Sequence, residues 1–591
     1  MLQNWLILRE KKMKELMLGN KAIARGFYEA GCSIISSYPG TPSTEITEEA
    51  AKYDEIYCEW APNEKVALEV AHGATVGGRR AACAMKHVGL NVAADPLFTI
   101  SYQGLNAGLI ICVADDPGMH SSQNEQDSRH YAIAAKVPML EPSDSQEAID
   151  FVKAGYEISE KYNTPVFIKL CTRVSHSQSV VNTCERVPFE QVPYKKDVTK
   201  VMMTKNSRDA HVRVEQRTKD LSQWAETCSL NRVEMAKTLS DGKKIGVITS
   251  STSYQYAKEV WGDTVSILKL GMVYPLPVKL ITDFASKVDE LYVLEELDPI
   301  IENYCKTLGL KVHGKDTFPV CGEFSQNLIR ECVGKPLPQI LKPEENIPPR
   351  PPVMCAGCPH RGIFYVLSKN KTMVYGDIGC YTLGAVAPLN AMDLNVCMGA
   401  SCSGLHGFNK AMGAAGEKNS VGVIGDSTFM HSGMTGICDI SYNMTNSTVI
   451  ILDNSITGMT GHQQNPTTGK NLRGEPAGKV NLEALCRALG FNRVTVVDPY
   501  QIENVEKVLK EELAAEEPSI IISRRPCVMI KGTVHEPPLH VEKEKCKGCK
   551  MCMKIGCPAI AFKDKKAEID ATQCTGCGMC TQMCKFDSIK R

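Results

Sequence analysis

The chain has 591 residues, 43% of them hydrophobic and 23% charged, which is the composition of a soluble protein with several domains. Basic and acidic residues balance at 67 each, so no overall charge favours binding to nucleic acid. The longest apolar runs fall far short of the roughly 20 residues that span a bilayer, and the apolar start of the chain is too short for a signal sequence. We therefore expect a cytoplasmic protein with neither nucleic acid nor membrane as partner.

Composition changes divide the chain into four expected domains. The boundaries are a polar stretch at 187–243, a linker with five prolines between Pro343 and Pro352, and a charged stretch at 533–545. The expected domains are 15–190, 240–340, 350–530 and 540–591. In the first three, short apolar runs alternate with helical patterns, as at 244–250, 254–261 and 266–271. This alternation predicts α/β domains with parallel sheets.

In the first domain, a buried helix is predicted to begin just after Pro62, because apolar residues between Val66 and Ala74 recur at helical spacing. Glu64 then falls in the first turn, where any carboxylate interacts favourably with the helix dipole. From these residues alone, that structural explanation is the more common one.

In the third domain, two short buried strands are predicted, at 421–425 and 447–453. They end in Gly425-Asp426-Ser427 and Asp453-Asn454. The intervening residues suffice for a crossover helix, so Asp426 and Asn454 should follow neighbouring parallel strands. Carboxylate, amide and carbonyl oxygens, the last from Ile456, suit Mg²⁺ bound to a diphosphate. A glycine turn with a capping aspartate is the commoner explanation of Gly-Asp alone.

The tail holds 8 of the 26 cysteines within its last 46 residues. Two CxxCxxC runs, each followed by a fourth cysteine, favour iron–sulfur clusters over zinc. The pattern resembles bacterial two-cluster ferredoxins. That resemblance implies one [4Fe–4S] cluster on Cys546, Cys549, Cys552 and Cys584, and another on Cys574, Cys577, Cys580 and Cys557. Two departures are the four residues, not three, between Cys552 and Cys557, and Lys585 in place of the usual proline.

Several further stretches resemble the 2-oxoacid:ferredoxin oxidoreductase family. Gly-Asp followed about 26 residues later by Asn resembles the thiamine diphosphate motif, with Ser427 replacing its third glycine. The other matching stretches are SSYPGTPSTEI (36–46), NEKVALEVAHGA (63–74), CAGCPHRG (355–362), GDIGCYTLG (376–384) and DNSITGMTGHQ (453–463). The implied fold is a set of transketolase-like domains that bind thiamine diphosphate, followed by a ferredoxin-like domain. The domains would be pyrimidine-binding, transketolase-C-like, diphosphate-binding and two-cluster, in that order.

The resemblance also implies roles for single residues. Asp426, Asn454 and the Ile456 carbonyl would hold Mg²⁺, and Glu64 would activate the pyrimidine ring. The residues expected to bind or face the cofactor are Cys355, Cys380, His406, Gly425 and Ser427. Thr41 is expected near substrate and cofactor, and His360 is expected to face the cofactor or its phosphates; both are expected, with Glu64, among the catalytic residues. Structural histidines at 360 and 406 remain open alternatives, as does a buried reduced pair or half a zinc site for Cys355 and Cys358.

Over nearly its whole length the chain resembles the α subunits of indolepyruvate ferredoxin oxidoreductases. This implies that an aryl 2-oxoacid and coenzyme A give an aryl-acetyl-CoA, CO₂ and reduced ferredoxin. Asp115 and Asp116 stand where pyruvate-specific relatives have a substrate-binding arginine, so pyruvate is disfavoured. Arg129 or Arg173 could replace that contact, although surface ion pairing explains either residue as well.

The chain has no segment resembling the family's gamma domain, so a separate β subunit and an α₂β₂ assembly are expected. Two rival functions remain open. A non-oxidative thiamine diphosphate decarboxylase would have no use for the tail, and an electron-transfer subunit without its own chemistry would need only the tail.

Overall fold

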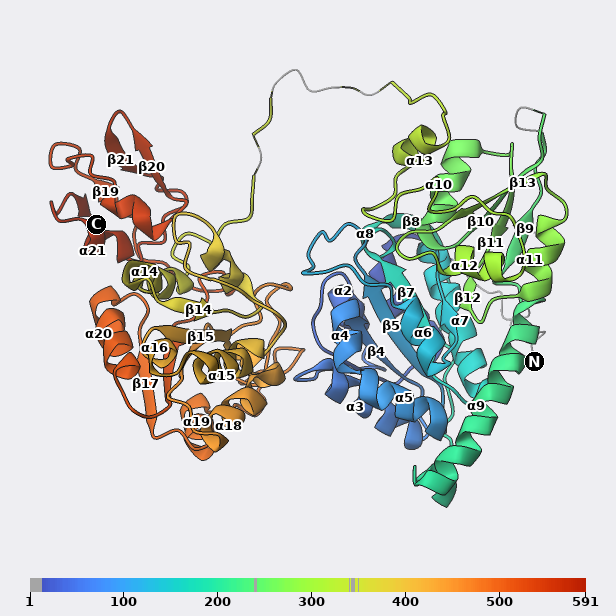
Figure 1. Cartoon of the computed structure of the whole chain (residues 1–591), viewed down its shortest axis with the longest axis horizontal. Helices are drawn as coiled ribbons and strands as arrows, with labels where there is room; N and C mark the ends of the chain where they lie inside the picture. Colours follow the sequence, from blue (N-terminus) through green and yellow to red (C-terminus); the bar gives the residue numbers. More distant parts are fainter. Residues whose placement is uncertain (1–12, 239–241, 340, 342–345, 349) are drawn as a thin grey trace. The chain divides into compact units, whose positions relative to one another are not determined.

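The structure is a computed structural model that describes residues 13–238, 242–339, 341, 346–348 and 350–591. The chain forms two compact units, Met1–Glu344 and Glu345–Arg591, each of which is described by itself (Figure 1). Five residues of the predicted proline linker, 342–345 and 349, lie outside the described residues. Within the described ranges, no helix has both the length and the apolar character needed to cross a bilayer.

The first unit is built on a seven-stranded sheet (Figure 1). Its order is β12 (Met272–Tyr274), β6 (Met139–Leu140), β7 (Val166–Cys171), β5 (Leu109–Asp115), β4 (Ala81–Lys86), β2 (Ile34–Ser37) and β3 (Tyr57–Trp60). All neighbours are parallel except β12 with β6. Strands β4, β5 and β7 are buried along their whole length, as parallel strands covered on both faces are. The shared edge strand β12 joins the segments predicted at 15–190 and 240–340 in one sheet.

Helices connect the strands of this sheet. They are α1 (Gly19–Glu29), α2 (Thr44–Ala50), α3 (Glu64–Val76), α4 (His87–Val92), α5 (Ala94–Gln103), α6 (Arg129–Ala135), α7 (Ser145–Tyr162) and α8 (Thr172–His176). Strands β1 (Met13–Leu18) and β8 (Gln178–Thr183) pair antiparallel beside them. The polar stretch after them contains the short helix η2 (Val198–Lys200) and the 22-residue helix α9 (Thr204–Ala225).

A four-stranded sheet completes the first unit. Its order is β13 (Glu290–Leu294), β10 (Ile245–Thr249), β11 (Ser266–Lys269) and β9 (Arg232–Glu234), with only β9 antiparallel. Its helices are α10 (Ser251–Trp261), α11 (Val278–Ala285), α12 (Ile300–Thr307) and α13 (Gln326–Cys332). Strand β10, helix α10 and the parallel strand β11 confirm the strand–helix–strand pattern predicted at 244–271.

The second unit contains a five-stranded, fully parallel sheet. Its order is β14 (Met373–Tyr375), β15 (Ser420–Gly425), β16 (Thr448–Asp453), β18 (Ser519–Arg524) and β17 (Arg493–Val497). Its helical segments are α14 (His360–Asn370), η3 (Cys380–Ala385), α15 (Ala400–Met412), α16 (Ala414–Glu417), α17 (Asp426–Thr428), η4 (Phe429–Gly433), α18 (Met434–Tyr442), α19 (Leu482–Ala488) and α20 (Ile502–Leu513). The two strands predicted at 421–425 and 447–453 are confirmed as β15 and β16.

The cysteine-rich tail packs in the same unit, because its buried residues belong to one hydrophobic core with those of α14 and the sheet. Its elements are β19 (His540–Val541), η5 (Met551–Ile555), β20 (Ile560–Lys563), β21 (Lys566–Ile569), α21 (Met579–Met583) and β22 (Ile589–Lys590). Strand β19 pairs with β22, and β20 pairs with β21. The first of these pairs ties the two ends of the tail together.

A buried ion-pair cluster also joins the two sheets of the first unit. Arg129 at the start of α6 lies 2.6 Å from Asp127 and 2.5 Å from Glu295, which follows β13, and all three side chains are at most 2% exposed. The guanidinium also donates to the carbonyls of Glu296 and Asp298. Removing the arginine would leave two buried carboxylates without a counter-charge.

We predict that Arg129→Met lowers the free energy of unfolding of the first unit by about 3–5 kcal/mol. Arg173→Met is the matched control, because Arg173 forms a half-exposed pair with Glu323 and should cost under about 1 kcal/mol. Every tryptophan of the chain precedes residue 262, so tryptophan fluorescence during denaturant unfolding of the whole chain reports on this unit. Equal midpoints for the two variants would contradict the prediction.

Candidate active site

Asp426 and Asn454 lie at one edge of the second unit's sheet, as predicted. Strands β15 and β16 are parallel neighbours with Gly425 opposite Leu452, so the residues that follow them emerge at the same edge. Asp426, at 2% exposure, and Asn454, at 8%, are both buried there. Carboxyl ends of parallel strands are where open α/β sheets bind ligands.

Three potential oxygen ligands converge at this edge. One terminal atom of the Asn454 amide lies 2.7 Å from the Ile456 carbonyl oxygen and 3.2 Å from Asp426 Oδ1. If this atom is the nitrogen of the NH₂ group, it donates hydrogen bonds to both oxygens. If it is the amide oxygen, it completes a set of three oxygen ligands that suits a hard cation. The donor set predicted from the sequence therefore fits Mg²⁺.

Electrostatics at Asp426 also fit a cation. Burial, and after it repulsion from Asp453, raises the pKa of Asp426 to about 7. Thr467 Oγ1 donates to Asp426 Oδ2 at 3.0 Å, and Asp453 instead pairs with Arg524 at 2.7 Å. No basic side chain of the described residues forms an ion pair with Asp426, so its charge is left for an external cation.

The residues flanking Asp426 are constrained by close packing. A Cβ atom on Gly425 would lie 2.7 Å from Cε1 of Tyr381, so only glycine fits there without a shift. Ser427 Oγ accepts a hydrogen bond of 2.9 Å from Thr457 Oγ1. Thr457 and Thr467 were not identified from the sequence, although the polar character of the loop after Asn454 was a usable signal.

His360 and Cys380 also lie close to the loop that carries Asn454. His360 begins α14, and its Nε2 is 3.4 Å from Asn454 Nδ2. Burial lowers the pKa of His360 to about 4, so the imidazole is neutral near pH 7. Cys380 begins η3, and a Cβ on Gly458 would lie 3.4 Å from its sulfur. Cys355, which directly precedes the turn at 356–357 that leads toward α14, is exposed.

The structure does not bring His406 to this edge. His406 lies within α15, where Nδ1 is 2.7 Å from Thr445 Oγ1 and Nε2 is 3.8 Å from Asp439. Thr445 precedes β16, so these contacts are at the opposite, amino end of the strand. The contacts of His406 are those of a structural histidine.

In the first unit, Glu64 is the first residue of α3, as predicted, and is 4% exposed. The preceding Asn63 caps the helix by accepting a 2.9 Å hydrogen bond from the backbone N–H of Val66. Gly89 of α4 packs directly on the carboxyl group, because a Cβ there would lie 2.4 Å from Glu64 Oε1. The carboxyl group is therefore held in a confined place with little water.

The loop with Thr41 packs on Lys86, a residue that the sequence did not single out. A Cβ on Gly40 would lie 3.1 Å from the Cβ of Lys86, the last residue of β4. Lys86 is 7% exposed and donates to the Ser121 carbonyl at 2.7 Å, and burial lowers its pKa to about 8. His87 follows it at 1% exposure. A buried cation of this kind, at the carboxyl end of a strand, has no signature in residue spacing.

The two aspartates and the two candidate arginines considered for substrate preference already have partners within the first unit. Asp115 accepts hydrogen bonds from the backbone N–H and the hydroxyl of Ser128. Asp116 accepts one each from the Ser121 backbone N–H, the Ser122 hydroxyl and the Thr172 hydroxyl. The explanation by surface ion pairing is wrong for Arg129, because this side chain is buried in the ion-pair cluster with Asp127 and Glu295. The same explanation holds for Arg173, which pairs with Glu323.

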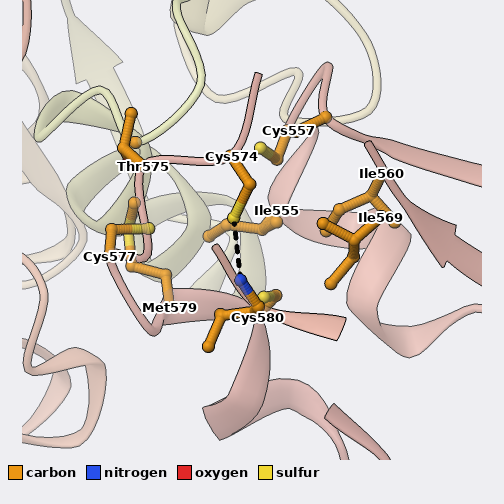
Figure 2. Close-up of a pocket in the computed structure, with 12 residues that line it drawn as sticks. Ile555, Cys557, Ile560, Ile569, Cys574, Thr575, Cys577, Met579 and Cys580 are labelled. Atoms are coloured by element: carbon orange, nitrogen blue, oxygen red, sulfur yellow. Dashed lines mark hydrogen bonds between the residues drawn. The ribbon is translucent and has the colours of Figure 1, made fainter. Parts of the chain in front are cut away.

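One predicted set of cluster cysteines surrounds a cavity. A small cavity of about 20 Å³ is lined by Cys557, Cys574, Cys577 and Cys580, together with apolar residues such as Ile555 and Met579 (Figure 2). The backbone N–H of Leu539 donates to the sulfur of Cys574 at 3.4 Å. Thiols around an apolar cavity, with a backbone N–H aimed at one sulfur, fit a [4Fe–4S] cluster.

The other set also converges. The Cys552 thiol interacts electrostatically with Cys546, Cys549 and Cys584, which raises its pKa after the larger effect of burial. Ser588 donates to the Cys584 sulfur from its hydroxyl at 3.0 Å and from its backbone at 3.4 Å. Within the described ranges, no group of three or more His, Cys, Asp or Glu side chains is arranged to bind a single metal ion. Cubane thiolates lie further apart because they bind different irons.

Three family models match the chain. The model described as "Pyruvate flavodoxin/ferredoxin oxidoreductase, thiamine diP-bdg" matches residues 25–230. "Thiamine pyrophosphate enzyme, C-terminal TPP binding domain" matches 377–523, and "4Fe-4S binding domain" matches 567–590. The first two matches contain Glu64 and Asp426 respectively, and the third contains the second cysteine run.

Curated relatives match over almost their full length. The chain is 39% identical to indolepyruvate oxidoreductase subunit IorA of Pyrococcus horikoshii, over 98% of this chain and 97% of the relative. The subunits of the same name from Archaeoglobus fulgidus and Methanothermobacter thermautotrophicus are 37% and 38% identical over the same shares. The chain belongs to the family of indolepyruvate oxidoreductase IorA subunits, thiamine diphosphate-dependent catalytic subunits of 2-oxoacid:ferredoxin oxidoreductases.

Proposed function

We propose that the chain catalyses the oxidative decarboxylation of an aryl 2-oxoacid, indolepyruvate being the leading candidate. The products would be an aryl-acetyl-CoA, CO₂ and reduced ferredoxin. One observation carries this proposal: the unit with the oxygen ligands at Asp426 also contains a cavity lined by four cysteines. A site for decarboxylation chemistry and a site for electrons thus fold together, and neither rival function uses both.

Asp426, Asn454 and the Ile456 carbonyl are proposed to hold Mg²⁺ against the diphosphate of thiamine diphosphate. When bound, the cofactor would supply a nucleophilic thiazolium carbon and a cationic ring that takes up the electron pair left by decarboxylation. Gly425 and Ser427 would let the diphosphate approach the backbone, and the neutral His360 and nearby Cys380 and Cys355 would face the cofactor. His406 is left out of this set because of its contacts at the other end of β16.

Glu64 is proposed to hold the proton that activates the pyrimidine ring. Its carboxyl group is 4% exposed and packed against Gly89, so water competes little for its hydrogen bond. Thr41 is proposed to lie near the substrate, since its loop packs on Lys86.

The two cysteine sets are proposed to hold two [4Fe–4S] clusters that pass electrons singly to ferredoxin. The partners in this scheme are coenzyme A, ferredoxin and a separate β subunit, assembled as α₂β₂ in the cytoplasm. The similar proteins are named as subunits, which supports a partner chain.

Glu64→Gln should lower indolepyruvate-dependent viologen reduction at least about 100-fold, because the amide cannot donate the activating proton. Glu69→Gln is the matched control on the same helix, since Glu69 is 45% exposed and pairs with the exposed Lys65. Both variants are assayed anaerobically with coenzyme A in the whole complex. Wild-type turnover by Glu64→Gln would support the electron-transfer rival instead.

Asp426→Asn should raise the Mg²⁺ concentration needed for half-maximal thiamine diphosphate binding at least about tenfold, because the single charged ligand is lost. Equilibrium dialysis of the cofactor against increasing Mg²⁺ measures the change. Asp564→Asn, in the exposed turn between β20 and β21, serves as control. An unchanged requirement for Mg²⁺ would remove Asp426 from the metal site.

Cys577→Ala should reduce iron and acid-labile sulfide from about eight to about four each per chain, because one cubane loses a ligand. Substrate-driven viologen reduction should fall with it. Cys438→Ala, an exposed cysteine of the same unit, should change neither. If Cys577→Ala decarboxylates indolepyruvate at the wild-type rate without coenzyme A, the non-oxidative decarboxylase is the better description.

A further inference from the structure

A buried arginine connects the diphosphate-binding part of the second unit to a cluster ligand. Arg361, the second residue of α14, is 2% exposed. Its Nη1 donates to the carbonyls of Gly556 at 2.5 Å and Ile555 at 3.2 Å, immediately before the ligand Cys557. The other guanidinium nitrogens donate to the carbonyls of Cys355, at 3.0 Å, and Met354. One side chain thus fastens two segments about 200 positions apart.

The loop that Arg361 binds is where the cysteine spacing departs from the bacterial pattern. Four residues separate Cys552 from Cys557, one more than in two-cluster ferredoxins. Within this loop Gly556 has φ +69°, and a Cβ there would lie 3.0 Å from Pro388 and 3.2 Å from Arg361 Nη1. The longer loop therefore presents two carbonyls to the arginine at a position that only glycine fills without strain.

The charge of Arg361 is not neutralised by a carboxylate. Among the described residues, the guanidinium's hydrogen-bond partners are four backbone carbonyls, and no acid lies within 4 Å. The titratable groups that interact electrostatically with it are the thiols of Cys557, Cys358, Cys355 and Cys577, and the first and last of these line the cluster cavity. A buried cation favours the more negative, reduced form of a cluster, and so raises its reduction potential.

The same short segment also reaches the proposed metal edge. His360, next to Arg361, lies 3.4 Å from Asn454, and a Cβ on Gly357 would lie 2.0 Å from Thr575 Oγ1, between two cluster cysteines. The cavity lined by Cys557, Cys574, Cys577 and Cys580 is therefore the cluster position that residues 355–361 join to the cofactor edge.

We propose that Arg361 docks the tail onto the diphosphate-binding domain and raises the reduction potential of the cluster on Cys557, Cys574, Cys577 and Cys580. That cluster would be the first to receive electrons from the decarboxylated substrate. The inference rests on the proposed function, because it requires both clusters to be present.

The test is a redox titration, followed by electron paramagnetic resonance, of the anaerobically purified complex with Arg361→Gln or Arg361→Lys. Arg493→Gln is the control, since Arg493 forms a partly exposed pair with Glu512 in the same unit. We expect Arg361→Gln to shift one of two midpoint potentials to more negative values, and Arg361→Lys to shift it less. The control should match the wild type.

Iron and sulfide analysis of the same samples separates the two ideas under test. Wild-type protein with fewer than about eight irons per chain would contradict the proposed function itself. If Arg361→Gln keeps its full iron content and both midpoint potentials are unchanged, the proposed role of Arg361 is overturned. It is also overturned if Arg361→Lys shifts the potential as much as Arg361→Gln does. If Arg361→Gln loses its iron, the test rests on Arg361→Lys. An unchanged midpoint potential in Arg361→Lys then overturns the inference, and a shift of that potential to more negative values supports it.

Discussion

The buried carboxylate of Asp426 is the constraint around which the second unit is organised. The parallel strands β15 and β16 bring it beside Asn454 and the Ile456 carbonyl, and none of the surrounding described residues offers it a positive charge. An isolated buried charge is costly, so the fold at this edge suits a bound cation better than an empty site. The hydrogen bonds from Thr467 and Thr457, and the close packing of Tyr381 on Gly425, hold the ligands in place for that cation.

The turn before α14, with the first two residues of that helix, extends this organisation to the tail. This segment contacts the metal edge through His360, the cluster cavity through Gly357 and the longer cysteine loop through Arg361. The tail shares one hydrophobic core with α14 and the sheet, so it is part of the catalytic unit and not a flexible appendage. This arrangement fits a reaction in which decarboxylation and one-electron transfer must follow each other at short range.

Periodicity and cysteine spacing predicted much of this structure. The strands that end at Gly425 and Asp453 and the helix that begins at Glu64 follow from local pattern, which is what periodicity encodes. The convergence of the two cysteine sets was implied by the resemblance to two-cluster ferredoxins. The contacts of Arg129 and Arg361 could not be predicted, because their partners lie about 170 and 200 positions away. The position of His406 also could not be predicted, because the sequence does not show which end of the neighbouring strand β16 the imidazole ring contacts.

The edge strand β12 has a consequence for how the chain is made. It pairs with β6, a strand of two residues that precedes it by more than a hundred positions. Synthesis proceeds from the N-terminus, so the first sheet emerges from the ribosome with that side uncovered while the polar connector and α9 are translated. An uncovered sheet side can pair with other chains. Slow translation of this stretch would therefore prolong the aggregation-prone stage of the newborn polypeptide.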